Sequence, residues 1–277
     1  LESFEVKNKK ILIWGEQGLG DYIIYSTILP DALKTDNEFI VVLDSRLLDL
    51  YKASFKDFKN VIFLDSAENE DLYDFHLPTA SLGQFFRNSK QDFLNQKIPL
   101  LEADKEHTKK LRNRINSGNK HICGISWMSK NPKIGDSKSM RLEDFKSIFS
   151  LPGIDFVDLQ YGDTKKEKKE LKDNFGFELI EMTDIDNFND IGKLASLINA
   201  CDFVVTTSNV TAHLAGALNK KTYQILSYTE GRLWYWGINE NSSLWYPSIR
   251  LLRADNLKDW KTPIKNLVDS LSQEIKL

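Results

Sequence analysis

The chain has 277 residues, of which 41% are hydrophobic and 28% charged, and its formal net charge is −3. These values are typical of a soluble globular protein with one large domain or two ordinary ones. The acidic balance argues against a general nucleic-acid-binding protein, which would carry a basic excess. No stretch approaches the roughly 20 apolar residues that span a bilayer, and no signal peptide is recognised.

Two cysteines, Cys123 and Cys201, lie in apolar surroundings. This placement predicts buried free thiols rather than a disulfide, and therefore a reducing, cytoplasmic location. The chain does not begin with Met, so we expect it to be a piece of a longer protein.

Strands and helices alternate in the first part of the chain. The order predicts a parallel sheet with helical crossovers, and Pro30 should bend or shorten the first helix. The predicted elements are a strand at 10–14, a helix at 21–33, a strand at 38–43, a helix at 46–54, a strand at 60–64, a loop at 76–78, a helix at 82–87 and a helix at 105–115. Residues 116–119 break the pattern and are predicted to be an interdomain linker.

The same pattern restarts at His121, which predicts a second α/β domain. The predicted domains are residues 1–117 and residues 118–277. One alternative is that the C-terminal helix packs back on the first domain. The predicted elements are strands at 121–127, 155–160, 178–181, 203–206 and 222–226, and helices at 142–149, 165–174, 191–200, 211–218 and 260–275.

A glycine-containing turn follows the first strand, with Gly15, Gly18 and Gly20 ahead of a helix. Such a turn can aim backbone N–H groups and a helix dipole at a ligand, or serve only to pack the helix on the sheet. Asp44, at the end of the next strand, has the position of a ribose-binding carboxylate. An NAD(P)-dependent oxidoreductase is therefore one alternative.

Asp21 follows Gly20 directly and argues against a pyrophosphate at this turn, because a carboxylate there would repel it. Two interpretations stay open. Asp21 is either a first-turn helix acid, which stabilises the helix by about 0.3–1 kcal/mol, or a general base.

A second turn of this kind precedes the predicted helix at 211–218. Ser208, Asn209 and Thr211 can cap that helix, or bind phosphate oxygens together with its free N–H groups. His213, one turn further on, is either a core histidine or part of the site.

A lysine-containing loop follows the first strand of the second half. It holds Lys130, Lys133, Lys138 and Ser139. The loop is either solvated or binds an anion, because ligands of open α/β sheets gather at the carboxyl ends of the strands. The four histidines lack metal-ligand spacing, and Asp184 and Asp186 suit a helix cap, so no metal site is predicted.

Five motifs in this order resemble a known family. They are Trp14 to Asp21, Gly124 to Trp127 with Lys138 and Ser139, Val157 to Gly162, Thr207 to Ala217, and Trp245 to Arg250. They are similar to the glycosyltransferase-like region that follows tetratricopeptide repeats in many bacterial proteins, which is itself similar to ADP-heptose:lipopolysaccharide heptosyltransferases of glycosyltransferase family 9. O-GlcNAc transferases are more distantly similar. This chain contains no tetratricopeptide repeat.

The resemblance implies a GT-B fold, with two Rossmann-like domains facing across a cleft. It implies a metal-independent enzyme with no cofactor, which takes a nucleoside-diphosphate-sugar as substrate on the second domain and an acceptor on the first. The implied roles are general base for Asp21, acceptor-side turn for Gly18 and Gly20, leaving-phosphate stabilisation for Lys138 with Ser139, Lys130 and Lys133, and diphosphate binding for Ser208, Asn209, Thr211 and His213.

Tyr161 and Tyr228, at two strand exits, are expected to flank the nucleotide base. Many relatives carry Asp-Thr where this chain has Ser208 and Asn209, which leaves the sugar open. The acceptor is a glycan, a lipid-linked glycan or lipopolysaccharide, or a protein hydroxyl. A non-catalytic GT-B domain that binds a sugar or a protein is the second alternative.

Overall fold

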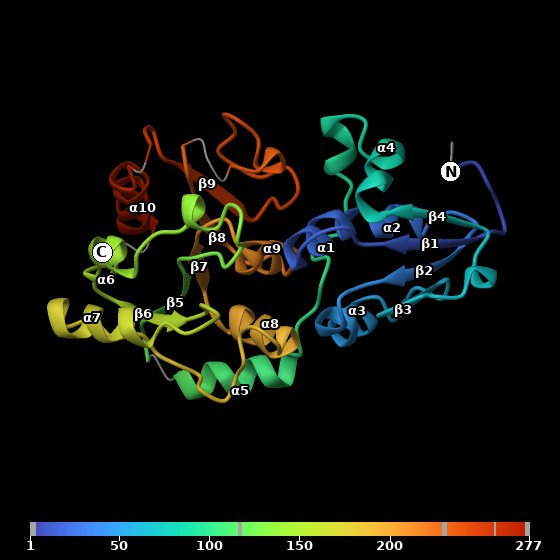
Figure 1. The fold of residues 1–277 in the computed structure, drawn as a ribbon. Helices are drawn as coiled ribbons and strands as arrows, with labels where there is room; N and C mark the ends of the chain where they lie inside the picture. The colour runs from blue at the N-terminus through green and yellow to red at the C-terminus, as the bar shows by residue number, and fades with distance from the viewer. Residues whose placement is uncertain (1–3, 116–117, 229–231, 258, 275–277) are drawn as a thin grey trace. The chain divides into compact units, whose positions relative to one another are not determined.

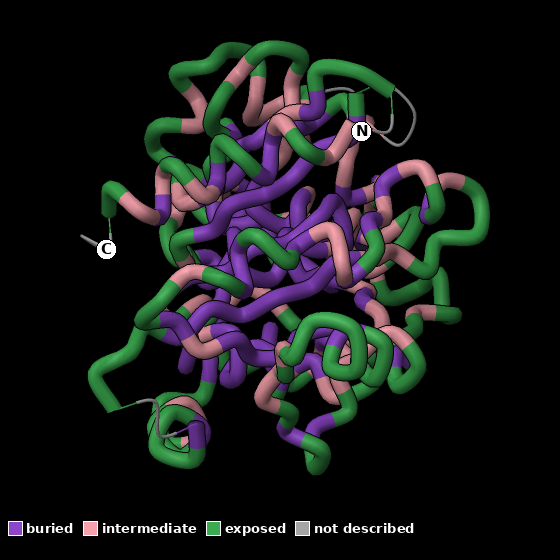
Figure 2. The backbone as a smooth tube through the Cα atoms, turned by 90° about the vertical axis from the view of Figure 1, so that its left-hand side faces the viewer, coloured by how far each residue is buried: buried purple, intermediate pink, exposed green. Residues whose placement is uncertain are grey.

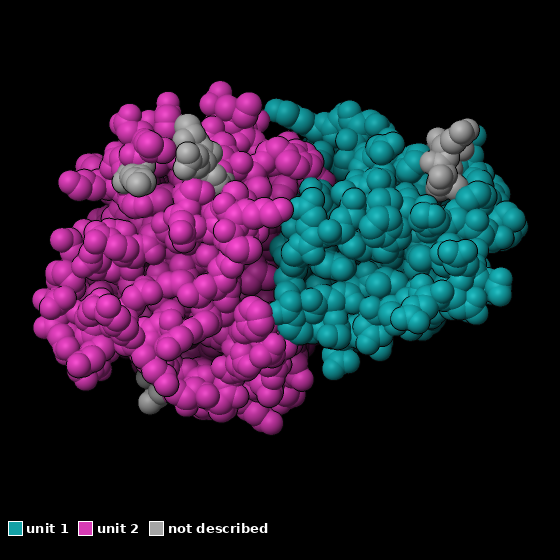
Figure 3. Space-filling view, viewed as in Figure 1, with its two compact units in different colours: residues 1–103 teal, residues 104–277 magenta. Residues whose placement is uncertain are grey.

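The computed structural model describes residues 4–115, 118–228, 232–257 and 259–274, and the chain divides into two compact units, 1–103 and 104–277 (Figure 3). Each unit holds its own parallel sheet with helices around it (Figure 1). This arrangement confirms the predicted fold class of two Rossmann-like α/β domains. No helix within the described ranges has both the length and the apolar character needed to cross a membrane.

Unit 1 is built on a four-stranded sheet of order β3-β2-β1-β4. Alternate residues of the central strand, such as Ile11 and Ile13, are fully buried on one face, as the two-residue period of a strand requires. The strands are β1 (Lys10–Trp14), β2 (Glu38–Val42), β3 (Val61–Leu64) and β4 (Phe75–Pro78), and the helices are α1 (Leu19–Tyr25), α2 (Leu29–Ala32), α3 (Leu48–Ser54) and α4 (Gly83–Phe86). Five 3₁₀ segments connect them: η1 (Ser26–Ile28), η2 (Ser45–Leu47), η3 (Glu70–Leu72), η4 (Thr79–Leu82) and η5 (Lys90–Phe93).

Two proline positions show where the first half departs from the prediction. The helix expected at 21–33 is interrupted, because Pro30 lies in the first turn of α2, where its missing N–H costs no hydrogen bond. The loop expected at 76–78 was wrong, since these residues belong to β4, which pairs with β1. β4 is an edge strand, and Pro78 ends it, so no ladder bond is lost.

Unit 2 is built on a five-stranded sheet of order β6-β5-β7-β8-β9. Its strands are β5 (His121–Ser126), β6 (Ile154–Asp158), β7 (Phe203–Thr206), β8 (Thr222–Leu226) and β9 (Ile249–Arg253). Its helices are α5 (Lys105–Ile115), α6 (Lys146–Phe149), α7 (Lys165–Phe175), α8 (Ile191–Ala200), α9 (Val210–Ala217) and α10 (Lys261–Glu274), with 3₁₀ segments η6 (Asp136–Lys138), η7 (Leu142–Phe145) and η8 (Trp234–Trp236).

Helix α5 belongs to unit 2, whereas the predicted boundary at 117/118 assigned it to the first domain. The helix packs on α8, and Arg112 anchors it by donating to the carbonyl of Ala200 at 2.7 Å and pairing with Asp202 at 2.8 Å. The structure therefore divides the chain before α5. Residues 116–117 of the predicted linker lie outside the described residues.

The C-terminal helix packs on its own unit. Leu267 and Leu271 of α10 are buried in the core beside α6 and the sheet, and Tyr223 of β8 donates to Glu274 at 2.7 Å. A fully buried leucine contributes about 1.5–3 kcal/mol, so these two side chains hold α10 on unit 2. Figure 2 shows the buried stretches of backbone in the interior and the exposed stretches along the outer loops.

Two further differences concern strands of unit 2. The strand expected at 178–181 is reduced to a single bridge between Ile180 and Val157. The sequence analysis missed β9, which pairs with β8 in parallel. Cys123 and Cys201 are buried free thiols, as predicted.

Candidate functional site

The carboxyl ends of β5 and β7 form the point in unit 2 where a ligand is expected. β5 pairs with β6 on one side and with β7 on the other, so the strand order reverses there. In open α/β sheets, ligands bind outside the strand ends at such a switch point. The lysine loop follows β5 and the start of α9 follows β7, so the fold brings these two predicted segments together.

Asn209 ties the two segments to each other. Its Oδ1 caps α9 by accepting from the N–H groups of Thr211 (2.9 Å) and Ala212 (3.3 Å). Its Nδ2 donates to Ser126 Oγ at 2.9 Å and to the carbonyl of Met128 at 3.2 Å. The side chain is buried and its polar atoms are engaged within the protein. The structure therefore gives Asn209 a positioning role and occupies two of the N–H groups that were expected to meet a phosphate.

Ser208 and His213 belong to a buried aromatic cluster. The Ser208 hydroxyl accepts from Nε1 of Trp236 at 3.0 Å and keeps its own hydrogen to donate. The Trp236 ring stacks on His213 with centroids 5.0 Å apart. The two nitrogens of His213 lie 3.4 Å and 3.3 Å from the hydroxyls of Tyr246 and Tyr235.

The small residues of α9 have a packing reason. A Cβ added at Gly216 would lie 2.4 Å from the Tyr246 ring. The glycine therefore makes room for one wall of the cluster, which sequence reasoning missed. The density of Trp and Tyr between residues 234 and 246 is the signal that could have revealed it.

Lys138 lies at the end of η6 and is 7% exposed. Its charge acts on His213, because burial first and the Lys138 ammonium second lower the pKa of His213 to about 3. His213 is therefore neutral at physiological pH. It lies in the core between the hydroxyls of two tyrosines. The Lys138 ammonium is close enough to act on it electrostatically.

Acid should destabilise the protein through His213. An unfolded histidine takes up a proton near pH 6.5, whereas the folded residue does so only near pH 3, so the free energy of unfolding falls as the pH drops below about 6.5. We expect a loss of about 2 kcal/mol between pH 7 and pH 5. Urea unfolding followed by tryptophan fluorescence measures it. His213→Gln should show a flatter pH dependence, and equal slopes would contradict the assignment.

Lys130 and Tyr161 meet on the β6 side of the switch point. The Lys130 N–H donates to the Tyr161 hydroxyl at 3.3 Å, and a Cβ added at Gly162 would lie 3.0 Å from Lys130 Cε. Gly162 has φ +88°, which a side chain would disfavour. Ser139 closes the lysine loop by accepting from Ser129 N–H at 2.9 Å. The side chain of Lys133 is exposed.

The predicted tyrosine pair is separated by the sheet. Tyr161 follows β6 and Tyr228 follows β8, with β5 and β7 between those strands. The two tyrosines therefore leave the sheet from strands that are not neighbours. Tyr161 lines a polar cavity of about 190 Å³, and Tyr228 lines a different hollow of about 470 Å³ that also contains Ser139. The joint role of both tyrosines at one base stays a prediction.

Gln160 organises the site and was not recognised from the sequence. Its buried Oε1 accepts from the N–H groups of Trp127 (2.8 Å) and Met128 (2.9 Å) and from Ser126 Oγ (3.0 Å). It therefore fixes the exit of β5, where the lysine loop begins. Gln160 follows the end of β6 by two residues, and a single glutamine at a strand exit carries no sequence signal for such a role.

The glycine turn of unit 1 is organised by Tyr22 and Asp21. A Cβ added at Gly15 would lie 1.9 Å from the Tyr22 ring, so glycine is required there by packing. Gly18 is the N-cap of α1, Gly20 lies in its first turn, and the Gly18 N–H donates to the Asp21 carboxylate at 3.2 Å. Asp21 thus closes the turn at the carboxyl end of β1.

Asp44 is engaged by a neighbour. Arg46 donates to its two carboxylate oxygens from Nε and Nη2, each at 2.8 Å, and this contact lowers the pKa of Asp44. A carboxylate held in this way is poorly placed to bind a ribose. The NAD(P)-dependent oxidoreductase alternative is then supported by the glycine turn alone.

Comparison with known proteins places this geometry in context. No protein-family model matches the chain. It is 26% identical over 290 residues to protein FlbA of Caulobacter vibrioides, covering 96% of this chain and 47% of FlbA. The chain thus spans about half the length of this curated relative.

Solved glycosyltransferase structures share the fold. The glycosyltransferase of family 9 from Veillonella parvula matches with a TM-score of 0.64 and 13% identity, over 99% of each chain. The ADP-heptose LPS heptosyltransferase II of E. coli matches with a TM-score of 0.62 and 14% identity, over 96% of this chain and 99% of that one. The two parallel-sheet α/β domains of this chain therefore have the fold of GT-B-like heptosyltransferase structures.

Proposed function

We propose that the chain is a GT-B glycosyltransferase, similar to family 9, that moves a sugar from a nucleoside-diphosphate-sugar to a hydroxyl acceptor. The observation that carries the proposal is the buried Lys138 beside the start of α9, at the switch point of the unit 2 sheet. The shared fold with a heptosyltransferase that is named for ADP-heptose supports it. We also propose the association with tetratricopeptide repeats that the sequence resemblance implies.

The donor diphosphate would lie between the lysine loop and the 208–211 segment. Lys138 would stabilise the negative charge that develops on the leaving phosphate, with Lys130 approaching from the β6 side. The Ser208 hydroxyl would donate to a phosphate oxygen while Trp236 holds its orientation. Preorganised cations and donors of this kind stabilise the transition state, so the proposed reaction needs no metal.

The acceptor would be activated by Asp21 at the turn of unit 1, where Gly18 orients the carboxylate. The acceptor class stays a proposal: a glycan, a lipid-linked glycan or a protein. Free cysteines and a nucleotide-sugar donor favour a cytoplasmic location. Turnover of a nucleotide-sugar, screened first by thermal shift against a panel of nucleotides and nucleotide-sugars, tests the function. The absence of both binding and turnover would favour the non-catalytic alternative.

Lys138→Met and Ser208→Ala should each weaken binding of the nucleoside diphosphate. A charge-assisted hydrogen bond contributes about 1.5–3 kcal/mol, so loss of the lysine should raise Kd by about 10- to 100-fold. Methionine keeps the aliphatic length of the buried side chain, and calorimetric titration measures the affinity. Lys133→Met is the matched control, because Lys133 lies exposed in the same loop. If both variants fold and bind the nucleoside diphosphate as tightly as the wild type, the proposed donor site is refuted.

A further inference from the structure

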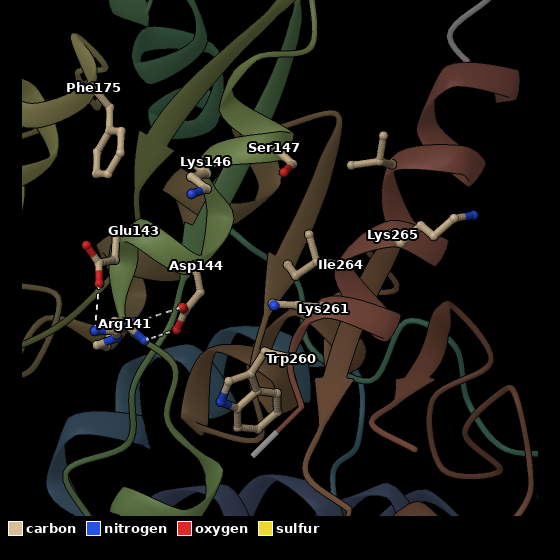
Figure 4. Close-up of a pocket in the computed structure, with 11 residues that line it drawn as sticks. Arg141, Glu143, Asp144, Lys146, Ser147, Phe175, Trp260, Lys261, Ile264 and Lys265 are labelled. Atoms are coloured by element: carbon tan, nitrogen blue, oxygen red, sulfur yellow. Dashed lines mark hydrogen bonds and ion pairs between the residues drawn. The ribbon is translucent and has the colours of Figure 1, made fainter. Parts of the chain in front are cut away.

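A groove on unit 2 lies between α10 and the segment that runs from Arg141 into α6 (Figure 4). Its volume is about 490 Å³, within the range of small-ligand sites. Its described lining contains none of the residues assigned above to the donor. The lining consists of Arg141, Glu143, Asp144, Lys146, Ser147, Phe175, Trp260, Lys261, Ile264, Lys265 and Val268.

Two of the lysines that line this groove are Lys146, from the start of α6, and Lys261, from the start of α10 (Figure 4). Neither forms an ion pair with any side chain in the described part of the chain. The Lys146 ammonium lies 5.7 Å from the centroid of the Phe175 ring. The other cations differ, since Arg141 pairs with Glu143 at 2.7 Å and Lys265 pairs with Asp269 at 2.6 Å. The groove thus offers two positive charges to a ligand.

An aromatic wall stands beside these charges. Trp260 lies at one end of the groove, and Ile264, which donates its N–H to the Trp260 carbonyl at 3.2 Å, forms the apolar floor next to it. An indole face binds flat heteroaromatic rings by stacking. Ser147 and the Asp144 carboxylate supply a hydroxyl and an acceptor at the same groove.

We propose that this groove binds a nucleoside phosphate, at a site separate from the donor. The phosphate would be held by Lys146 and Lys261, the base would stack on Trp260, and Asp144 would accept from a ribose hydroxyl. Lysine suits this task because it acts on phosphate as a point charge. The proposal can be tested apart from the glycosyltransferase function, because it does not use Lys138, Lys130 or Ser208. Asp144, Trp260 and Lys261 also line the neighbouring hollow that contains Ser139 and Tyr228, so the test below separates the two sites.

Calorimetric titration of the whole chain with ADP, and in parallel with UDP and GDP, tests the proposal. At least one nucleotide should show two classes of site. The double variant Lys146→Gln/Lys261→Gln should weaken one class by at least tenfold and leave the other unchanged, and Trp260→Leu should weaken the same class. Lys120→Gln is the control, because this lysine of unit 2 is not among the lining residues and pairs with Asp155 at 2.8 Å.

The failures are distinguishable. If the double variant, folded as judged by circular dichroism, binds each nucleotide like the wild type, the groove site is refuted. A single class weakened by both the double variant and Lys138→Met would refute a separate site. Equal affinity of the groove for inorganic pyrophosphate and for ADP would refute the role of Trp260. If only the groove class is present, the proposed donor site fails and this inference stands.

Discussion

Replacing Asp21 by asparagine is expected to lower sugar transfer by about 10²- to 10⁴-fold, which is the usual contribution of a general base. Asparagine keeps a carbonyl oxygen that can accept from Gly18 N–H, so the start of α1 should persist. The amide cannot take a proton from an acceptor hydroxyl at neutral pH. The residues proposed for the donor all belong to unit 2, so donor affinity should change little.

Steady-state transfer measures this effect once an acceptor is known, and donor hydrolysis serves before then. Asp49→Asn is the matched control, because Asp49 is an exposed acid in the first turn of α3 in the same unit. Its activity should equal that of the wild type. Near-native transfer by the Asp21→Asn variant would reduce Asp21 to a helix-start acid, and the base would have to lie elsewhere.

Local pattern was enough to predict most of the two sheets. Strands such as β1 and β7 are short apolar runs that lead into a turn rich in small residues, so their positions follow from the sequence. β4 was missed because Pro78 reads as a strand breaker, and only its place at the sheet edge makes it tolerable. The position of α5 depends on Arg112 reaching α8, a contact that no local pattern contains.

The candidate site shows the same division. The sequence pattern places Ser208 and Asn209 at a strand end and Lys138 in the loop after the preceding central strand, and the fold brings these segments to one switch point. What each side chain does there depends on tertiary partners. The Ser208 hydroxyl is held by Trp236, which lies 28 residues away, and the polar atoms of Asn209 are turned inward. The separation of the two tyrosines follows from the strand order, which propensity does not determine.

Loss of Asn209 should therefore cost stability. Asn209→Ala removes the cap of α9, a loss of typically about 1 kcal/mol. It also removes the hydrogen bonds to Ser126 Oγ and to the Met128 carbonyl, each of which contributes about 0.5–1.5 kcal/mol. We expect a combined loss of about 2–4 kcal/mol in the free energy of unfolding.

Urea unfolding followed by tryptophan fluorescence measures this loss. Asp190→Ala is the matched control, because Asp190 caps α8 by accepting from Lys193 N–H at 3.0 Å and makes no comparable tie to the lysine loop. It should cost only about 1 kcal/mol. Asn209→Ser restores a helix cap without the tie to Met128, so its stability should fall between those of the wild type and Asn209→Ala. If Asn209→Ala costs no more than Asp190→Ala, the tie between the lysine loop and α9 contributes nothing. In that case, direct binding of the nucleotide-sugar would be the better interpretation of Asn209.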